Sequence, residues 1–133
     1  VGSGSGWTSA LLRSIVGRQG RVFGVELVPE LVTFGKQNLG KYNLPQATIE
    51  SAERGALGKL AEAPFDRILV SAVAEKLPQE LVSQLKEGGV MVAPIGDAIC
   101  RIEKRGKGKI TKKCYPGFAF VPLIMDKKVE RGK

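Results

Sequence analysis

The sequence lacks histidine altogether, contains only two cysteines and has no long apolar run. Without histidine, neither a Ser–His or Cys–His catalytic pair nor a zinc site with imidazole ligands can form. No stretch approaches the roughly 18 uninterrupted apolar residues of a membrane helix. The first residues, Val1–Gly4, do not form the basic and then apolar pattern of a secretory signal. We therefore expect a cytoplasmic protein without a membrane partner.

The two cysteines, Cys100 and Cys114, do not have the spacing of metal ligands. If the segments around them, Ile99–Arg105 and Lys109–Tyr115, pair as a hairpin, the two thiols lie near each other. Disulfides are rare in the cytosol. We therefore expect both thiols to be reduced.

The positive charge is confined to the last third of the chain. Residues 1–100 hold 10 Lys/Arg and 10 Asp/Glu, whereas residues 101–133 hold 11 and 3, which accounts for the net charge of +8. Such a block can attract nucleic acid or an acidic polypeptide. It is also typical of a solvated hairpin and tail, the interpretation that we favour. We expect no specific nucleic-acid partner.

The length of 133 residues suits one domain. We expect residues 1–125 to form its core and residues 126–133 to form a basic, disordered tail. Because the chain enters at Val1 inside a glycine motif, we also expect the domain to start further upstream.

Helical and strand patterns alternate along the first two thirds of the chain. The predicted elements are a glycine run at Gly2–Gly6, a helix at Thr8–Val16, a strand at Arg21–Leu27, a helix at Glu30–Leu39, strands at Gln46–Glu50 and Arg67–Ser71, a helix at Pro78–Lys86 and a strand at Val90–Ile95. Three segments then follow without helices and indicate antiparallel strands: Ile99–Arg105, Lys109–Tyr115 and Phe118–Met125. This order predicts an α/β fold with a doubly wound, mostly parallel open sheet and antiparallel strands at its C-terminal edge.

The glycine run and Glu26 form the candidate site. In such sheets, ligands bind beyond the carboxyl ends of the strands, where glycines allow a sharp turn and close backbone approach. The helix that follows the run presents unpaired N–H groups there. Glu26 lies 20 residues beyond Gly6, at the end of the next strand, where a carboxylate can accept both hydroxyls of a ribose. The spacing G-x-G-x-G, with Trp7 in place of a later glycine, argues against the G-x-G-x-x-G fingerprint of NAD-binding proteins.

Several segments together resemble the protein-L-isoaspartate O-methyltransferase family. They are Val1-Gly2-Ser3-Gly4-Ser5-Gly6-Trp7, Gly20-Arg21-Val22, Val25–Leu31, Ala63–Ala72, Leu85–Gly89, Val92–Gly96 and Phe120-Val121-Pro122-Leu123. The last of these is the most family-specific, and the likeness extends from residue 1 to about residue 124. The resemblance implies a Rossmann-like methyltransferase core that binds S-adenosylmethionine.

The resemblance also implies roles for individual residues. Gly2, Ser3, Gly4, Ser5 and Gly6 would line the methionine and ribose side of the cofactor, and Trp7 would either touch the methionine end or pack the first helix. Glu26 would bind the ribose hydroxyls and Leu27 would pack on the adenine. Ser51 and Ala52 fall where the family has a Gly-Asp-Gly segment whose acid contacts the adenine amine. Because Ser51 replaces that acid incompletely, Glu50 or Glu53 is expected to take over.

The implied reaction is methyl transfer to the free carboxylate of an L-isoaspartyl residue in a damaged protein, which is a repair function. A carboxylate is ionised at neutral pH, so the reaction needs no strong general base. We assign no catalytic residue, because the family's substrate-side segment lies before the glycine motif, upstream of Val1. The alternatives are a tRNA adenine-N1 methyltransferase, which the basic final third favours, and a non-catalytic cofactor-binding module.

Overall fold

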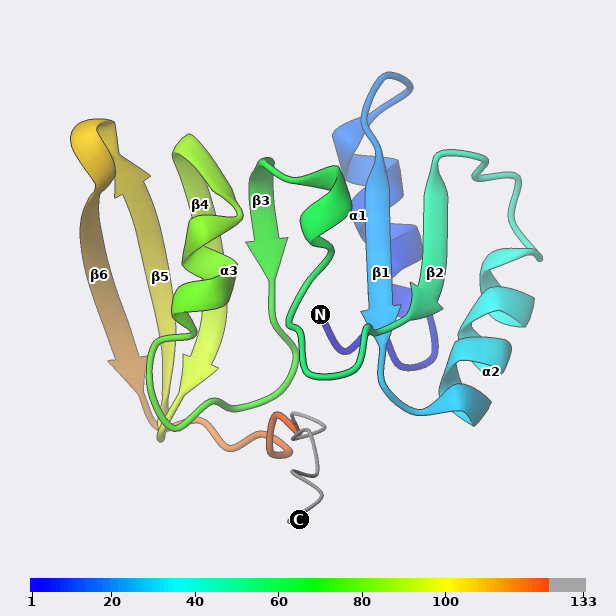
Figure 1. The fold of residues 1–133 in the computed structure, drawn as a ribbon. Coiled ribbons are helices and arrows are strands. Elements are labelled where there is room, and N and C mark those ends of the chain that lie inside the picture. The colour runs from blue at the N-terminus through cyan, green and yellow to red at the C-terminus, as the bar shows by residue number, and fades with distance from the viewer. Residues whose placement is uncertain (125–133) are drawn as a thin grey trace, which may run out of the picture. The chain divides into compact units, whose positions relative to one another are not determined.

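The computed structural model describes residues 1–124, drawn in colour in Figure 1. The chain divides into two compact units, Val1–Ala52 and Glu53–Lys133, and each is described by itself. Within residues 1–124, no helix has both the length and the apolar character needed to cross a membrane. The predicted tail at 126–133 lies outside the described residues.

The first unit is a parallel strand pair with two helices. Its elements are α1 (Trp7–Val16), β1 (Val22–Glu26), α2 (Pro29–Leu39) and β2 (Ala47–Ser51). β1 and β2 pair in parallel from Val22 opposite Ala47 to Glu26 opposite Ser51. Parallel neighbours need a crossover connection, which α2 supplies. Pro29 stands in the first turn of α2, where its missing N–H costs nothing.

Both helices pack on one side of this pair. The buried cluster joins Val32 and Leu39 of α2 to Ala47 and Ile49 of β2, with Ala10 of α1 packed against it. The guanidinium of Arg13, also buried, donates from Nε to Gln46 Oε1 at 3.0 Å and from a terminal nitrogen to the Gly17 carbonyl at 2.5 Å. These bonds tie the end of α1 to the chain that enters β2.

The second unit contains a mixed sheet in the order β3-β4-β5-β6. Its strands are β3 (Phe65–Leu69), β4 (Leu85–Ile95), β5 (Ala98–Arg105) and β6 (Lys109–Pro116), with the short helix α3 (Gln79–Ser83) and 3₁₀ turns at Leu60–Glu62 and Gly106–Gly108. β3 and β4 are parallel, whereas β4, β5 and β6 are antiparallel. Met91 and Ile102, directly opposite each other on β4 and β5, are fully buried.

Glu80 in the first turn of α3 and Gln84 at its end hold the loop before the first 3₁₀ turn. Glu80 Oε1 accepts from the N–H of Leu57 at 2.9 Å. The amide of Gln84, 1% exposed, accepts from the Lys59 N–H at 3.0 Å and donates to the Leu57 carbonyl at 2.7 Å. This irregular segment is therefore anchored by hydrogen bonds rather than by regular secondary structure.

The predicted fold class is confirmed, with differences in three elements. The strand expected at Phe118–Met125 is wrong over its described residues: after the turn at Gly117, with φ 97°, the segment makes only an isolated parallel bridge between Pro122 and Val73. α3 ends at Ser83 and β4 already starts at Leu85, whereas the prediction continued the helix to Lys86. β3 begins two residues earlier than predicted.

The hairpin of β5 and β6 forms as expected and aligns its cysteines. Cys100 lies directly opposite Cys114, with a Cα–Cα distance of 4.0 Å, and the two form a disulfide. The expectation of two reduced thiols is therefore wrong for this structure. The expectation rested on the rarity of disulfides in the cytosol. The register of the hairpin, which places Cys100 opposite Cys114, brings the two sulfur atoms together instead.

Candidate functional site

The glycine run forms a tight turn that leads into α1, and its first residues, Gly2 and Ser3, bond to the Val25 carbonyl of β1. Gly2, Gly4 and Gly6 have φ angles of 76°, 50° and 82°, in the left-handed region that favours glycine. A Cβ on Gly6 would lie 2.8 Å from the carbonyl oxygen of Gly35. Gly6 is thus required twice, for its backbone angle and for its contact with α2.

Helix α2 holds this turn through two residues that the sequence interpretation missed. Asn38 Nδ2 donates to the carbonyl of Ser5 at 2.9 Å. Gly35 approaches so closely that a Cβ there would lie 2.8 Å from the Gly4 carbonyl. The signal for Gly35 was present in the sequence, since a glycine inside a helical pattern indicates close backbone approach or another special demand. Asn38 gave no such signal.

Glu26 is the central side chain of the site. It is 8% exposed at the end of β1. Its Oε2 accepts from the N–H of Gly4 at 2.8 Å, and its Oε1 accepts from the N–H groups of Leu27 at 2.9 Å and Val28 at 3.2 Å. The carboxylate therefore connects the glycine turn to the loop that leaves β1.

The ends of β1 and β2 complete the arrangement. Ser51 lies opposite Glu26 in the parallel register and is exposed. The N–H of Ala52 donates to the Glu26 carbonyl at 2.8 Å. Leu27 is half-buried beside them. The predicted residues from the glycine turn, the end of β1 and the end of β2 thus come together within the first unit.

Three features leave room for a polar ligand at the turn. The hydroxyl of Ser3 is buried and has no hydrogen-bond partner among the described residues. A Cβ placed on Gly4 would meet no atom within 4 Å. Helix α1 begins after Gly6 without a side-chain cap. Trp7, the first residue of α1, is 63% exposed, and its role in binding stays a prediction.

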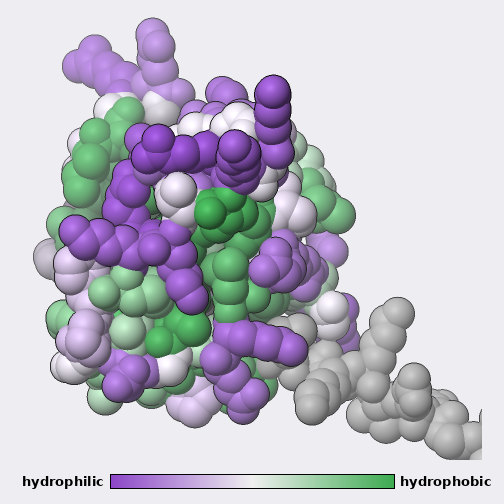
Figure 2. All heavy atoms as spheres, turned by 90° about the vertical axis from the view of Figure 1, so that its left-hand side faces the viewer, coloured by the Kyte–Doolittle hydropathy of each residue, from purple (hydrophilic) through white to green (hydrophobic). Residues whose placement is uncertain are grey.

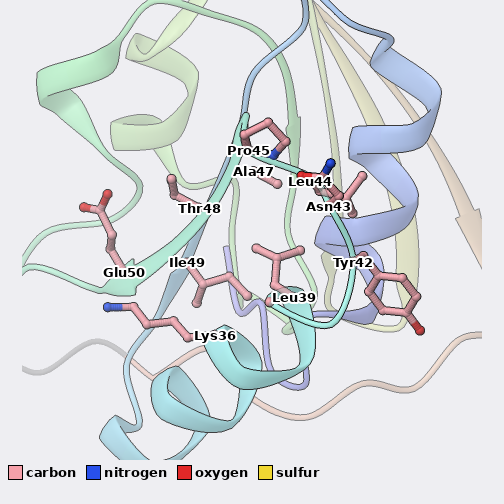
Figure 3. Close-up of a pocket in the computed structure, with 11 residues that line it drawn as sticks. Lys36, Leu39, Tyr42, Asn43, Leu44, Pro45, Ala47, Thr48, Ile49 and Glu50 are labelled. Atoms are coloured by element: carbon pink, nitrogen blue, oxygen red, sulfur yellow. The ribbon is translucent and has the colours of Figure 1, made fainter.

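Glu50 and Glu53, the residues expected to replace the acid missing at Ser51, lie in different parts of the structure. Glu53 belongs to the second unit. Glu50 lines a separate open pocket of about 490 Å³, drawn in Figure 3. The pocket is lined by Lys36, Leu39, Gly40, Tyr42, Asn43, Leu44, Pro45, Ala47, Thr48, Ile49 and Glu50. The glycine turn, Trp7, Glu26, Leu27, Ser51 and Ala52 lie outside this pocket, whereas Glu50, the expected substitute for the adenine contact, lines it.

Comparison with known proteins identifies relatives over nearly the whole chain. Residues 1–128 match the family model described as protein-L-isoaspartate(D-aspartate) O-methyltransferase. A relative of that name from Methanopyrus kandleri is 42% identical over 128 residues, covering 93% of this chain and 57% of the relative. One from Pyrococcus horikoshii is 40% identical over 129 residues, with coverage of 93% and 57%. The chain thus spans a little more than half the length of these curated relatives.

Solved structures show the same fold. A Plasmodium falciparum protein assigned as a protein-L-isoaspartate O-methyltransferase, crystallised with S-adenosyl-L-homocysteine, superposes with a TM-score of 0.74 at 27% identity, over 92% of this chain and 63% of that one. A second protein-L-isoaspartate O-methyltransferase superposes with a TM-score of 0.84 over 94% of this chain and 41% of its own length. At 22% identity it supports the fold alone.

The parallel strands, the crossover helix and the glycine turn that meets a strand-end carboxylate define a Rossmann-like α/β protein. Within that class, the matched residues decide the family. The chain belongs to the protein-L-isoaspartate(D-aspartate) O-methyltransferase family. The relatives named above give no support to the tRNA adenine-N1 methyltransferase or to a non-catalytic module.

Proposed function

We propose that this chain binds S-adenosylmethionine at the glycine turn and is the cofactor-binding part of an enzyme that methylates the free carboxylate of L-isoaspartyl residues in damaged proteins. The family match over residues 1–128 carries the proposal. The demethylated form of this cofactor, S-adenosyl-L-homocysteine, bound to the Plasmodium falciparum structure supports it. Repair of isoaspartyl proteins and a cytoplasmic location are part of this proposal.

The residues present fit such a cofactor. Ser3 has a buried hydroxyl without a partner among residues 1–124, and Gly4 has open space where a side chain would project. A carboxylate offers about four acceptor positions. Three positions of Glu26 already accept backbone N–H groups, which leaves one on Oε2. Glu26 can thus accept one ribose hydroxyl without releasing the turn, and the second hydroxyl needs another acceptor or the release of one amide.

The residues of this chain act by binding and orientation. Glu26 fixes the position of the Gly4 N–H before any ligand arrives, so little backbone ordering remains to be done on binding. The bound cofactor would supply an activated methyl group on a sulfonium. A substrate carboxylate is ionised at neutral pH, so the chain needs no residue to remove a proton from it. Acceleration then comes mainly from positioning two reactants.

A direct test is methyl transfer from labelled S-adenosylmethionine to an L-isoaspartyl peptide, with the same peptide containing L-aspartate as control. We expect label on the isoaspartyl peptide alone. Because the chain spans about half of its curated relatives, the assay uses the protein together with any residues upstream of Val1 in its gene. Transfer to tRNA, or failure of that longer protein to methylate either peptide, overturns the proposal.

A further inference from the structure

The hairpin of β5 and β6 carries the strongest concentration of charge in the described residues. Its basic side chains are Arg101, Lys104, Arg105, Lys107, Lys109, Lys112 and Lys113, and its one acid is Glu103. All residues of β6 are exposed. Figure 2, which views the molecule from the β6 side of Figure 1, shows long hydrophilic side chains standing out around apolar surface. This hairpin is therefore a basic surface with little internal neutralisation.

The register of the hairpin sets like charges against each other. Arg101 lies directly opposite Lys113, and Arg105 lies directly opposite Lys109. Directly opposite side chains project to the same face, where like charges destabilise the pair. Glu103 contacts Arg101 at 2.9 Å and Arg105 at 3.4 Å, both on its own strand. Opposite them, Lys113 lies over the ring of Tyr115, 5.3 Å from its centroid, and within the described residues neither Lys109 nor Lys113 forms an ion pair, so the repulsion between the two strands is only partly offset.

The outer edge of β6 also has unused backbone groups. β6 pairs with β5 and with no other strand of the described residues. The Cα–Cα distance of 4.0 Å between Cys100 and Cys114 is that of a pair that exchanges no backbone hydrogen bonds. By the alternation of an antiparallel ladder, the N–H and C=O groups of Ile110, Lys112 and Cys114 point to the open edge. These groups are spaced to receive one more strand.

We propose that this edge docks an extended acidic polypeptide segment, which adds as a strand beside β6 and places its carboxylates against the lysines. Added strands bind through main-chain hydrogen bonds and gain selectivity from alternate side chains. Lys109 and Lys113 share one face of β6 and Lys112 lies on the other, so acidic residues on either face of the incoming segment meet a positive charge. The docking is independent of methyl transfer.

The chemistry of the edge favours polypeptide over nucleic acid. Carbonyl oxygens alternate with N–H groups along it, and a polypeptide backbone satisfies both, whereas phosphates meet repulsion from the carbonyls. Glu103 adds a further negative charge on the same face as Lys109 and Lys113. A second copy of β6 is disfavoured as well, because its lysines would face these lysines, which is a common protection of edge strands.

The binding test uses a fluorescein-labelled peptide of alternating glutamate and valine, with a glutamine-for-glutamate peptide and a 20-nucleotide RNA as competitors. The triple variant Lys109→Gln/Lys112→Gln/Lys113→Gln removes the edge charge. The variant Arg18→Gln/Lys41→Gln/Lys76→Gln removes the same net charge from exposed positions elsewhere. We expect anisotropy at physiological salt to show about tenfold weaker binding for the first variant and a change below about twofold for the second.

Hydrogen exchange then distinguishes strand addition from diffuse attraction. The acidic peptide should slow exchange of the Ile110, Lys112 and Cys114 amides, whereas the amides of Thr111 and Lys113 already bond to β5 and should change little. Circular dichroism checks that both triple variants keep the fold. Equal weakening by the two variants, unchanged exchange at the edge amides, or tighter binding of the RNA than of the peptide would each overturn the proposal. None of these results depends on methyl transfer.

Discussion

The backbone N–H of Gly4 and the carboxylate of Glu26 are joined by a hydrogen bond of 2.8 Å across 22 residues of sequence. This bond links a turn that cannot hold its own shape to the rigid end of β1. Because the same carboxylate also accepts from Leu27 and Val28, Glu26 both shapes the candidate site and faces it. Substitutions at Glu26 therefore test structure and binding together.

Replacing Glu26 by alanine is expected to weaken S-adenosylmethionine binding by about 1.5–3 kcal/mol, because a charged hydrogen-bonding partner is lost. Glu26→Gln keeps the shape and one acceptor oxygen, so it should retain more of the turn while losing the charge. Calorimetric titration of both variants measures the two effects. Unchanged affinity in Glu26→Ala, or tighter binding of NAD than of S-adenosylmethionine, would contradict the site assignment.

Gly6 and Gly4 form a matched pair for testing the turn. Both have positive φ, so alanine at either costs about 1–2 kcal/mol of stability. At Gly6 the added Cβ also lies 2.8 Å from the Gly35 carbonyl, whereas at Gly4 it meets nothing within 4 Å. We expect Gly6→Ala to lower the free energy of unfolding clearly more than Gly4→Ala in urea titrations. Equal losses would show that α2 moves aside easily.

The sequence predicted more of this architecture than of the contacts that hold it together. The apolar patterns and the punctuating glycines located α1, β1, α2 and β2 to within a few residues, because those elements bury regular faces. Glu26 was found by its distance from the glycine run. The bonds from Asn38 to Ser5 and from Gln84 to Leu57 and Lys59 were not found, because polar contacts between irregular segments leave no periodic signal.

The last described segment, residues 117–124, shows the same limit of prediction from sequence. The apolar run from Phe118 predicted a strand, but Pro122 and the turn at Gly117 leave one bridge to Val73. The expectation of burial that an apolar run carries fails as well, since Phe118, Phe120 and Val121 are all more than 40% exposed. It did not describe the backbone either, which meets Val73 through the Val121 carbonyl and the Leu123 N–H alone. The cofactor-binding roles of all the site residues stay predictions, as does the division into a core and a tail.

The disulfide between Cys100 and Cys114 should contribute to stability. It closes a loop of sequence separation 14, for which chain-entropy arguments give about 3 kcal/mol. Reduction is expected to lower the thermal midpoint of the wild-type chain and to leave a Cys100→Ala/Cys114→Ala variant unaffected by the same reductant. Thiol titration of the untreated protein should detect no free thiol. Detection of both thiols would mean that the cysteines are reduced, as the sequence alone suggested.

A polypeptide that starts at Val1 should become more stable as the pH rises from about 6 to 8. Burial lowers the pKa of the Val1 amine from 8.0 to about 6, and the charge of Glu26 opposes that shift only in part. Between these values the unfolded chain holds a proton that the folded chain does not, so unfolding becomes harder with increasing pH. Below pH 6 and above pH 8, the Val1 amine adds no further change of the free energy of unfolding with pH. Thermal melts of free and acetylated Val1 chains measure it, and the acetylated chain should lack this rise.

Residues upstream of Val1 are expected to raise stability by extending the sheet at β1. The N–H groups of Gly2 and Ser3 both donate to the Val25 carbonyl, at 2.9 and 3.1 Å. On the β2 side of β1, the Val22 N–H donates to the Gln46 carbonyl and the Glu26 carbonyl accepts from the Ala52 N–H. The Val25 carbonyl points to the opposite edge of β1, so Gly2 and Ser3 lie along that edge. A strand that leads directly into Val1 would continue this contact in parallel with β1. Because buried backbone groups without partners cost about 1–3 kcal/mol each, pairing this edge of β1 with an upstream strand should stabilise the fold.

The comparison that tests this is between the polypeptide of residues 1–133 and a version that carries the upstream residues of its gene. We expect the longer version to unfold at a higher urea concentration and with a steeper transition, because more surface is buried in the folded state. We also expect it alone to methylate the isoaspartyl peptide, since the substrate-side residues are predicted upstream. A proline placed two residues before Val1 should remove much of the added stability, whereas alanine there should not. Full activity from residues 1–133 would show that the substrate site lies within those residues.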